Sequence, residues 1–250
     1  MSDTAFALSG KTALITGGGS GIGAAVCGEL ARAGARILVA DINLEAATKV
    51  AATLPDATAL ELDVASFEAV QKAAASIPEL DILVNNAGIG MVGTIETTSA
   101  EDFDRIMRVN VNSVFYMTQS FLPALLRRRG SIVNIASVAG LVGIKLRFAY
   151  CTSKGAVVAM TRQLAVEYPK QLRVNCICPG TVDSPFVAGY LAKYHAGEED
   201  TVREQLKARQ PVGRLGRPDE VASLTRYICS AEAEFMTGSV VTLDGGWTAA

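Results

Sequence analysis

The sequence has little histidine, no long apolar run and no excess of one charge, and each shortage excludes a class of protein. His195 is the only histidine among 250 residues and stands in a polar segment, which argues against a Ser-His-Asp triad and against a metal site built from histidines. The longest apolar candidate, residues 138–144, is interrupted by glycine and is far shorter than the roughly 20 residues of a membrane span. The N-terminus has no basic segment followed by an apolar one, so we expect no secretory signal.

The balance of charge excludes a further group of functions. With 23 basic and 25 acidic residues, the chain has a net charge of -2, which disfavours binding to nucleic acid or to an anionic membrane. Half of the residues are hydrophobic, which excludes disorder. The five cysteines, an odd number, lie in apolar stretches without histidines that could complete a metal site. We therefore expect reduced thiols, no bound metal and a cytoplasmic location.

Short apolar runs alternate with longer amphipathic stretches along the chain. The runs are rich in Val, Ile and Leu without polar alternation, as in strands that are buried on both faces of a parallel sheet. The predicted strands are residues 12–16, 36–41, 58–62, 82–85, 131–136, 173–178 and 240–243. The predicted helices are residues 21–33, 44–53, 67–76, 100–128, 150–168 and 219–230. This order predicts an α/β fold with a doubly wound, seven-stranded parallel sheet flanked by helices.

A glycine-rich turn joins the first predicted strand to the first predicted helix. The turn contains Gly17, Gly21 and Gly23, and such a turn lets a pyrophosphate approach the free N–H groups of a helix N-terminus. Asp41 ends the second predicted strand, 18 residues after Gly23. A carboxylate there accepts both ribose hydroxyls of NAD and repels the 2'-phosphate of NADP. No basic residue flanks this position, so the sequence predicts an NAD site.

Several short motifs follow one another at fixed spacings. They are Gly17-x-x-x-Gly21-x-Gly23, Asn85-Asn86-Ala87-Gly88, Ser137, Tyr150, Lys154 and Pro179-Gly180. Together they resemble the short-chain dehydrogenase/reductase family, in its compact branch, over residues 8–247. The resemblance implies a single Rossmann-fold domain over residues 1–250, an oxidoreductase that uses NAD, and a substrate lid at about residues 184–216.

Tyr150 and Lys154 are four residues apart at the start of a predicted helix, so they share one face. A free tyrosine with a pKa near 10 is a poor base at neutral pH, but a neighbouring ammonium group stabilises the phenolate and lowers that pKa. The resemblance implies that Tyr150 is the general base and that Lys154 tunes it and holds the nicotinamide ribose. It also implies that Ser137 binds the substrate oxygen and that Asn110, inside a long predicted helix, supports a proton relay.

The resemblance also implies which residues bind the cofactor. Asp63 meets the adenine amino group with Val64 beside it, and Pro179 borders the nicotinamide. Ser184 stands where many relatives have threonine, and either hydroxyl can bond to the carboxamide. The full set is Gly17, Ser20, Gly21, Ile22, Gly23, Asp41, Asp63, Val64, Asn85, Ala87, Gly88, Tyr150, Lys154, Pro179, Gly180, Val182 and Ser184.

Basic residues near the active site indicate an anionic substrate. The lid segment, residues 184–217, has more basic than acidic residues although the whole chain is slightly acidic. Arg147 stands three residues before Tyr150, in a loop expected beside the active site, and arginine can bind a carboxylate through two hydrogen bonds. We therefore expect a small anionic molecule as the substrate.

The strings VNCICPGTVDSPF, KARQPVGR and DGGW resemble a narrower group that acts on small hydroxy acids. It includes 3-hydroxybutyrate dehydrogenases and 4-dehydrogenases of 2-keto-3-deoxy sugar acids of the fuconate or rhamnonate type. The resemblance implies a substrate site of Ser137, Arg147, Tyr150 and Arg209, with both arginines on the carboxylate. The hydroxybutyrate enzymes carry a further arginine early in the lid, near the place of Tyr190. We therefore expect a deoxy-keto sugar acid, with 3-hydroxybutyrate or a neutral polyol as alternatives.

A nucleotide-sensing module without turnover is a different class of protein that could share this fold. It is disfavoured because such a sensor would not require Asn110, Ser137, Tyr150 and Lys154 together. Relatives pair the long helices that carry Asn110 and Tyr150, which implies a homotetramer. Trp247 is expected either in the core or against the active site of a neighbouring subunit.

Overall fold

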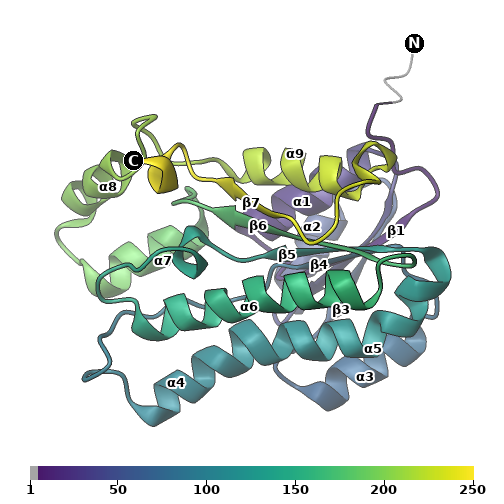
Figure 1. Cartoon of the computed structure of the whole chain (residues 1–250), viewed down its shortest axis with the longest axis horizontal. Coiled ribbons are helices and arrows are strands. Elements are labelled where there is room, and N and C mark those ends of the chain that lie inside the picture. Colours follow the sequence, from purple (N-terminus) through teal and green to yellow (C-terminus); the bar gives the residue numbers. More distant parts are fainter. Residues whose placement is uncertain (1–4) are drawn as a thin grey trace.

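The seven predicted strands are confirmed and form one parallel sheet. The computed structural model describes residues 5–250, and its strands are β1 (Thr12–Thr16), β2 (Arg36–Asp41), β3 (Ala57–Glu61), β4 (Ile82–Asn85), β5 (Ser131–Ile135), β6 (Arg173–Pro179) and β7 (Val240–Leu243). Their order across the sheet is β3-β2-β1-β4-β5-β6-β7. Figure 1 shows this sheet between two layers of helices, so the predicted doubly wound Rossmann fold is confirmed.

The strand order reverses at β1. Leu14 of β1 pairs with Leu38 of β2 on one side and with Leu83 of β4 on the other. The chain extends the sheet first through β2 and β3 and then, in the opposite direction, through β4 to β7. Ligands of such sheets bind outside the carboxyl ends of the strands at this reversal. A ligand site is therefore expected just beyond Thr16 and Asn85, the last residues of β1 and β4.

Helices cover both faces of the sheet (Figure 1). One layer contains α1 (Gly21–Arg32), α2 (Leu44–Ala51) and α9 (Pro218–Cys229), and the other contains α3 (Phe67–Ser76), α4 (Ala100–Met107), α5 (Ser113–Arg128) and α6 (Phe148–Glu167). Successive side chains of a strand point to opposite faces. Accordingly, Ile15 packs in one core cluster with residues of α1 and α9, and Leu14 packs in a second cluster with residues of α5. Within residues 5–250, no helix combines the length and apolarity needed to cross a membrane.

Two strands differ from the expectation that all would be buried on both faces. Every residue of β4 and β5 is buried, whereas residues of β3 and β7 are only half-buried or exposed. β3 and β7 are the edges of the sheet, so each has a neighbouring strand on one side only.

The predicted helix over residues 100–128 is wrong in one respect, because it is interrupted. A π-helical turn, Arg108–Asn112, separates α4 from α5. Such turns insert a residue into an α-helix and occur frequently at functional sites. Asn110 in this turn is buried, and its side-chain amide bonds to the backbone of Ile89. The turn thereby directs a polar side chain inward, which helical periodicity alone does not reveal.

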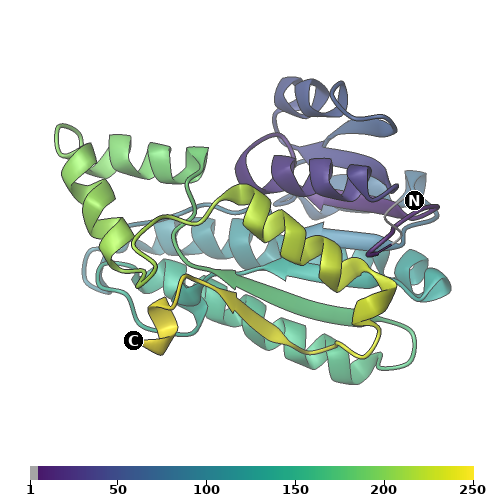
Figure 2. The same ribbon diagram turned by 90° about the horizontal axis from the view of Figure 1, so that it is seen from above.

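The predicted lid contains two helices that the sequence analysis did not anticipate. They are α7 (Pro185–Tyr194) and α8 (Glu199–Ala208), and they lie beyond the carboxyl ends of the strands, apart from the two helical layers (Figure 2). They share a small apolar cluster of Val187, Leu191, Val202, Leu206 and Leu215. Because this cluster is small and most other lid residues are polar, composition made the segment look like a loop.

Candidate active site

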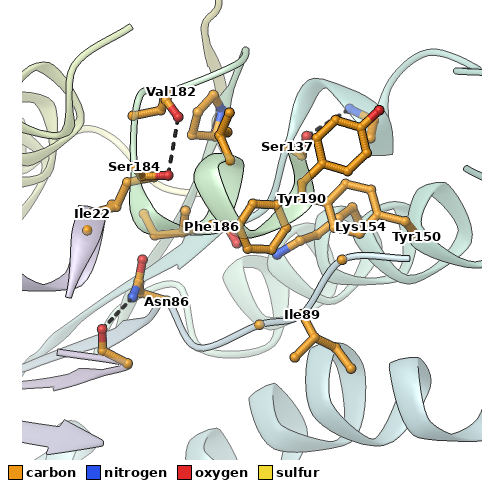
Figure 3. A pocket seen from close by; sticks show the side chains of 18 of the residues that line it. Ile22, Asn86, Ile89, Ser137, Tyr150, Lys154, Val182, Ser184, Phe186 and Tyr190 are labelled. Atoms are coloured by element: carbon orange, nitrogen blue, oxygen red, sulfur yellow. Dashed lines mark hydrogen bonds between the residues drawn. The ribbon is translucent and has the colours of Figure 1, made fainter. Parts of the chain in front are cut away.

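A cavity of about 750 Å³ lies at the carboxyl ends of the strands, between the sheet and the lid. Figure 3 shows Val182 and Ser184 on one side of it and Tyr150 and Lys154 on the other. Most of the predicted cofactor and substrate residues line this single cavity. They are Gly17, Ser20, Gly21, Ile22, Asp41, Asp63, Val64, Ala87, Gly88, Ser137, Arg147, Tyr150, Lys154, Pro179, Gly180, Val182, Ser184 and Arg209.

The glycine-rich turn depends on its glycines in two ways, through backbone angles and through close packing. Gly17 and Gly21 have positive φ angles of 64° and 52°, which glycine adopts without steric cost. Gly23 does not line the cavity, but a Cβ atom there would collide with the carbonyl oxygen of Gly17. Ser20, the N-cap of α1, makes no side-chain capping bond within the described residues. The first turn of α1 therefore keeps free N–H groups, which suit an anion.

Two carboxylates near this turn are fixed by backbone hydrogen bonds. The carboxylate of Asp41 accepts from the N–H of Gly19 through one oxygen and from the N–H of Asn43 through the other, both at 2.9 Å. Asp63 accepts from the N–H of Ala65 at 2.9 Å. Both carboxylates also line the cavity. They are thus acceptors whose positions are set before any ligand binds.

The structure does not place Asn85 in the cavity wall. Its side-chain amide is buried in the sheet and donates to the side chain of Asn134 at 2.8 Å. The next residue, Asn86, lines the cavity instead, and its amide donates to the carbonyls of Thr16 at 2.9 Å and Gly17 at 3.2 Å (Figure 3). Neighbouring residues of an extended segment point in opposite directions. In the Asn-Asn motif, the side chain of Asn85 therefore stabilises the sheet, and the side chain of Asn86 stabilises the glycine-rich turn.

Ser137, Tyr150 and Lys154 come together on one side of the cavity (Figure 3). As predicted, α6 presents Tyr150 and Lys154 one turn apart, and the Lys154 Nζ atom lies 5.9 Å from the centre of the Tyr150 ring. The same Nζ atom donates to the carbonyl of Ile135 at 3.0 Å. The Ser137 hydroxyl accepts from the N–H of Ala139 at 3.1 Å. The strand β5 and the helix α6 thus fix all three side chains in one wall.

Burial governs the ionisation of two of these groups. It raises the pKa of Tyr150 above its ordinary value, and this effect outweighs the lowering by the Ser137 hydroxyl and by the charge of Arg147. This direction is opposite to the one expected from the charge of the Lys154 ammonium group alone. Burial likewise lowers the pKa of Lys154 to about 8. Both shifts have one cause, since removal from water disfavours the charged form of each group.

Asn110 lies behind the cavity wall rather than in it. Its Oδ1 accepts from the N–H of Ile89 at 2.8 Å, and its Nδ2 donates to the carbonyl of Ile89 at 2.9 Å and to the Ser153 hydroxyl at 3.1 Å. Gly88, which lines the cavity, packs on the same amide: a Cβ atom on it would lie 3.2 Å from Asn110 Oδ1 and 3.5 Å from Lys154 Nζ. Asn110 therefore clamps the segment Gly88–Ile89 against α6.

Arg147 and Arg209 line the lid end of the cavity. The Arg147 Nη1 atom donates to the carbonyl of Met91 at 3.1 Å. The Arg209 guanidinium group lies 5.8 Å from the Trp247 ring, which places Trp247 in the wall of this chain's own cavity. Within residues 5–250, neither arginine forms a salt bridge. Both cations are thus available to an anionic ligand.

Phe186 is a wall residue that the sequence analysis missed. Its ring centre lies 6.4 Å from that of Tyr150, and a Cβ atom on Gly90 would lie 2.7 Å from its Cζ atom. It follows Ser184, the N-cap of α7, whose hydroxyl donates to the Val182 carbonyl at 3.2 Å. Proline favours the first turn of a helix, so the string Ser-Pro-Phe carried the signal that α7 begins here.

Comparisons with known proteins agree with this fold. The sequence profile of a family described as Enoyl-(Acyl carrier protein) reductase matches residues 17–248. A 2-(S)-hydroxypropyl-CoM dehydrogenase 3 of Xanthobacter autotrophicus is 39% identical, over 97% of this chain and 98% of its own. A 2-keto-3-deoxy-L-fuconate dehydrogenase of Xanthomonas campestris pv. campestris is 38% identical, over 96% of this chain and 81% of its own. The ligand-free structure of the aldohexose dehydrogenase of Thermoplasma acidophilum has a TM-score of 0.89 and 31% identity, with 97% and 95% coverage.

These matches define the class of protein. The chain belongs to the short-chain dehydrogenase/reductase family. It is an oxidoreductase of the kind that oxidises secondary alcohols, with a small-molecule substrate and a nicotinamide cofactor. The cavity that the fold forms at the carboxyl ends of its strands is its candidate active site.

Proposed function

We propose that the protein uses NAD to oxidise a secondary hydroxyl group of a small carboxylate to a ketone. The proposed substrate is a 2-keto-3-deoxy sugar acid of the fuconate or rhamnonate type, oxidised at C4. The observation that carries the proposal is the position of two arginines. Arg147 and Arg209 line the same cavity as Tyr150 and Lys154. Neither arginine has a carboxylate partner within residues 5–250. A guanidinium group binds a carboxylate through two parallel hydrogen bonds. The similarity to the fuconate dehydrogenase supports this class of substrate.

The nucleotide half of the cavity fits NAD. The crowded glycine turn and the free N–H groups of α1 would take the pyrophosphate. Asp41, whose carboxylate is already fixed, would accept the ribose hydroxyls and repel the 2'-phosphate of NADP. Asp63 and Val64 would border the adenine. The nicotinamide end would be bordered by Ala87, Gly88, Lys154, Pro179, Gly180, Val182 and Ser184.

The proposed reaction divides the work among three side chains. The nicotinamide, when bound, supplies the acceptor for the hydride that leaves the substrate carbon. Tyr150 takes the proton of the substrate hydroxyl on its phenolate oxygen, and the Lys154 ammonium group stabilises that phenolate. Ser137 donates a hydrogen bond to the substrate oxygen. Because burial raises the pKa of Tyr150, we expect the oxidation rate to rise with pH across the neutral range.

NADH formation followed by absorbance, over a panel of hydroxy acids, deoxy sugar acids and neutral polyols, tests the proposal. The variant Tyr150→Phe lacks the group that takes the proton, so kcat should fall by at least about 100-fold. Tyr116→Phe, in which the altered tyrosine packs against Phe67 outside the cavity, is the matched control. Full activity of Tyr150→Phe would contradict the proposed base.

Two alternative substrates use the same machinery. 3-Hydroxybutyrate would engage the same arginines, whereas a neutral polyol is favoured by the similarity to the aldohexose dehydrogenase. Simple carboxylates such as propionate separate the two cases. They should inhibit competitively if Arg147 and Arg209 bind a carboxylate, and they should not inhibit an enzyme of neutral polyols.

We extend the proposal to the form in which the protein works. Residues 1–250 would form one domain, with residues 184–216 as a lid; residues 1–4 lie outside the described residues. The protein would act as a homotetramer in the cytoplasm. A monomeric mass in solution would contradict the tetramer.

A further inference from the structure

Tyr190 links the lid to the proposed anion-binding arginine. It lies on α7, is half-buried and lines the cavity. The central carbon of the Arg147 guanidinium lies 4.3 Å from the centre of its ring, well inside the distance of about 6 Å over which a cation and an aromatic face attract. Through this contact the lid touches the loop that precedes α6.

The Tyr190 ring is fixed from behind. Its hydroxyl lies 2.6 Å from the Nε2 atom of His195, within hydrogen-bond distance, and the two rings meet edge to face at 5.0 Å. His195 is itself held at the end of α7, where its N–H donates to the carbonyl of Leu191 at 2.8 Å. The body of the ring packs against the apolar cluster of the lid. These attachments keep one face of the ring turned toward Arg147.

Arg147 keeps most of its hydrogen-bond donors free. The loop that carries it is pinned by two backbone bonds, from the N–H of Gly93 to Leu146 at 2.9 Å and from the N–H of Phe148 to Gly93 at 3.1 Å. A guanidinium group has five N–H donors, and within residues 5–250 only the bond to Met91 uses one of them. The guanidinium group lies over the Tyr190 ring, and the N–H donors that do not bond to Met91 remain for a carboxylate.

We propose that Tyr190 is a positioning residue that determines the preference for an anionic substrate. Its ring holds the Arg147 guanidinium so that the free donor edge meets the anionic group of the substrate, and His195 holds the ring. This inference rests on the proposed function, because it presupposes that Arg147 binds the substrate. The new element of the inference is that the lid, through the ring of Tyr190, positions the guanidinium group of Arg147.

The dissociation constant of 2-keto-3-deoxy-L-fuconate, titrated calorimetrically into the protein saturated with NADH, measures this role without turnover. Tyr190→Leu removes the ring face and should weaken binding about tenfold. Tyr190→Phe keeps the face and should weaken it less than about threefold. Tyr227→Leu, which alters a tyrosine that packs on Phe6 outside the cavity, should leave the constant unchanged. Thermal melts check folding, and Tyr190→Met replaces the leucine variant if that one does not fold.

A double-mutant cycle distinguishes positioning from a merely structural role. If Tyr190 acts through Arg147, then Tyr190→Leu should cause no further weakening in an Arg147→Gln background. Full weakening in that background, no weakening in the single variant, or a loss in Tyr190→Phe as large as in Tyr190→Leu would each overturn the inference. If Arg147→Gln binds the acid as tightly as the wild type, the proposed function fails as well. If Arg147→Gln weakens binding and Tyr190→Leu does not, only the present inference fails.

Discussion

At the scale of the residue, the cavity holds three of its basic side chains, Lys154, Arg147 and Arg209, in two different ways. Lys154 is buried, and its ammonium group bonds to the carbonyl of Ile135 beside the Tyr150 ring. Arg147 and Arg209 are more accessible and rest against aromatic rings. An ammonium group is strongly hydrated and loses more on burial than a guanidinium group does. The buried Lys154 ammonium group is therefore suited to stabilise the phenolate of Tyr150 when it forms. The accessible guanidinium groups of Arg147 and Arg209 are suited to bind an anion.

The burial of Lys154 predicts a pH-dependent stability. The pKa of Lys154 is about 8 in the folded protein, against an ordinary value of 10.5, so between these values the unfolded chain binds more protons. The free energy of unfolding should therefore rise with pH from about 8 to 10.5. At pH 7 Lys154 is charged in both the folded and the unfolded protein, so the folded protein bears the full free-energy cost of burying an ammonium group. Lys154→Met should therefore be more stable than the wild type by roughly 2–3 kcal/mol.

Urea unfolding at pH 7 and pH 10, without added nucleotide, measures this difference. The advantage of Lys154→Met should shrink at pH 10, whereas Lys72→Met, which alters an exposed lysine, should show no such trend. A Lys154→Met protein that is less stable than the wild type at pH 7 would count against the argument.

We expect the carboxylate of Asp41 to determine the preference of the enzyme for NAD over NADP. Removal of its carboxylate in Asp41→Ala removes the repulsion of a 2'-phosphate, so the ratio of kcat/KM for NADP to that for NAD should rise at least about tenfold. Initial rates with both cofactors measure the ratio. Asp56→Ala, which alters an exposed carboxylate outside the cavity, serves as the control. An unchanged ratio in Asp41→Ala would remove the basis for proposing NAD.

At the scale of the element, the π-helical turn and the two lid helices shape the site. The π-helical turn between α4 and α5 aims Asn110 at the backbone of Ile89 and so fixes the segment that borders the cavity. The lid helices α7 and α8 bring Phe186, Tyr190 and Arg209 to the opposite wall. The strands supply the frame, and these segments add a fixed backbone segment on one side of the cavity and the wall on the other.

The π-helical turn predicts an unequal response to two neighbouring substitutions. Asn110→Ala leaves the half-buried N–H and carbonyl groups of Ile89 without their side-chain partner and should lower the free energy of unfolding by about 1–3 kcal/mol. Asn112→Ala, in the same turn but exposed, should change it by less than about 0.5 kcal/mol. Chemical denaturation of both variants gives the comparison. Equal losses would show that the turn itself, rather than the Asn110 bonds, provides the stability.

The sequence was informative where one physical signal dominates. Apolar runs predicted all seven strands, and in central strands such as β4 and β5 the physical reason is that burial between two helical layers leaves no polar alternation. Helical periodicity could not predict the π turn, since one inserted residue hardly disturbs an apolar pattern. The lid helices were missed because their apolar cluster is small. Asn85 and Asn86 are chemically identical, so only the backbone direction at the end of β4 shows which one faces the cavity.

At the scale of the whole molecule, the sheet and the lid divide the proposed reaction between them. The switch point of the sheet places the glycine-rich turn, Asp41 and the side chains of α6 along one edge. The lid adds Phe186, Tyr190 and Arg209, and Tyr190 lies against Arg147 of the loop before α6. In the proposed reaction the cofactor would therefore be bound along the sheet, and the anionic substrate would be bound between the lid and the loop before α6.

The most direct test of the central claim is the kcat/KM for 2-keto-3-deoxy-L-fuconate with NAD, set against that for an aldohexose with the same cofactor. The proposed function predicts a preference for the acid of at least about 100-fold, because the aldohexose leaves Arg147 and Arg209 without an anionic partner. It also predicts that Arg147→Gln loses most of this preference. An equal or greater kcat/KM for the neutral sugar would show that the cavity does not select a carboxylate.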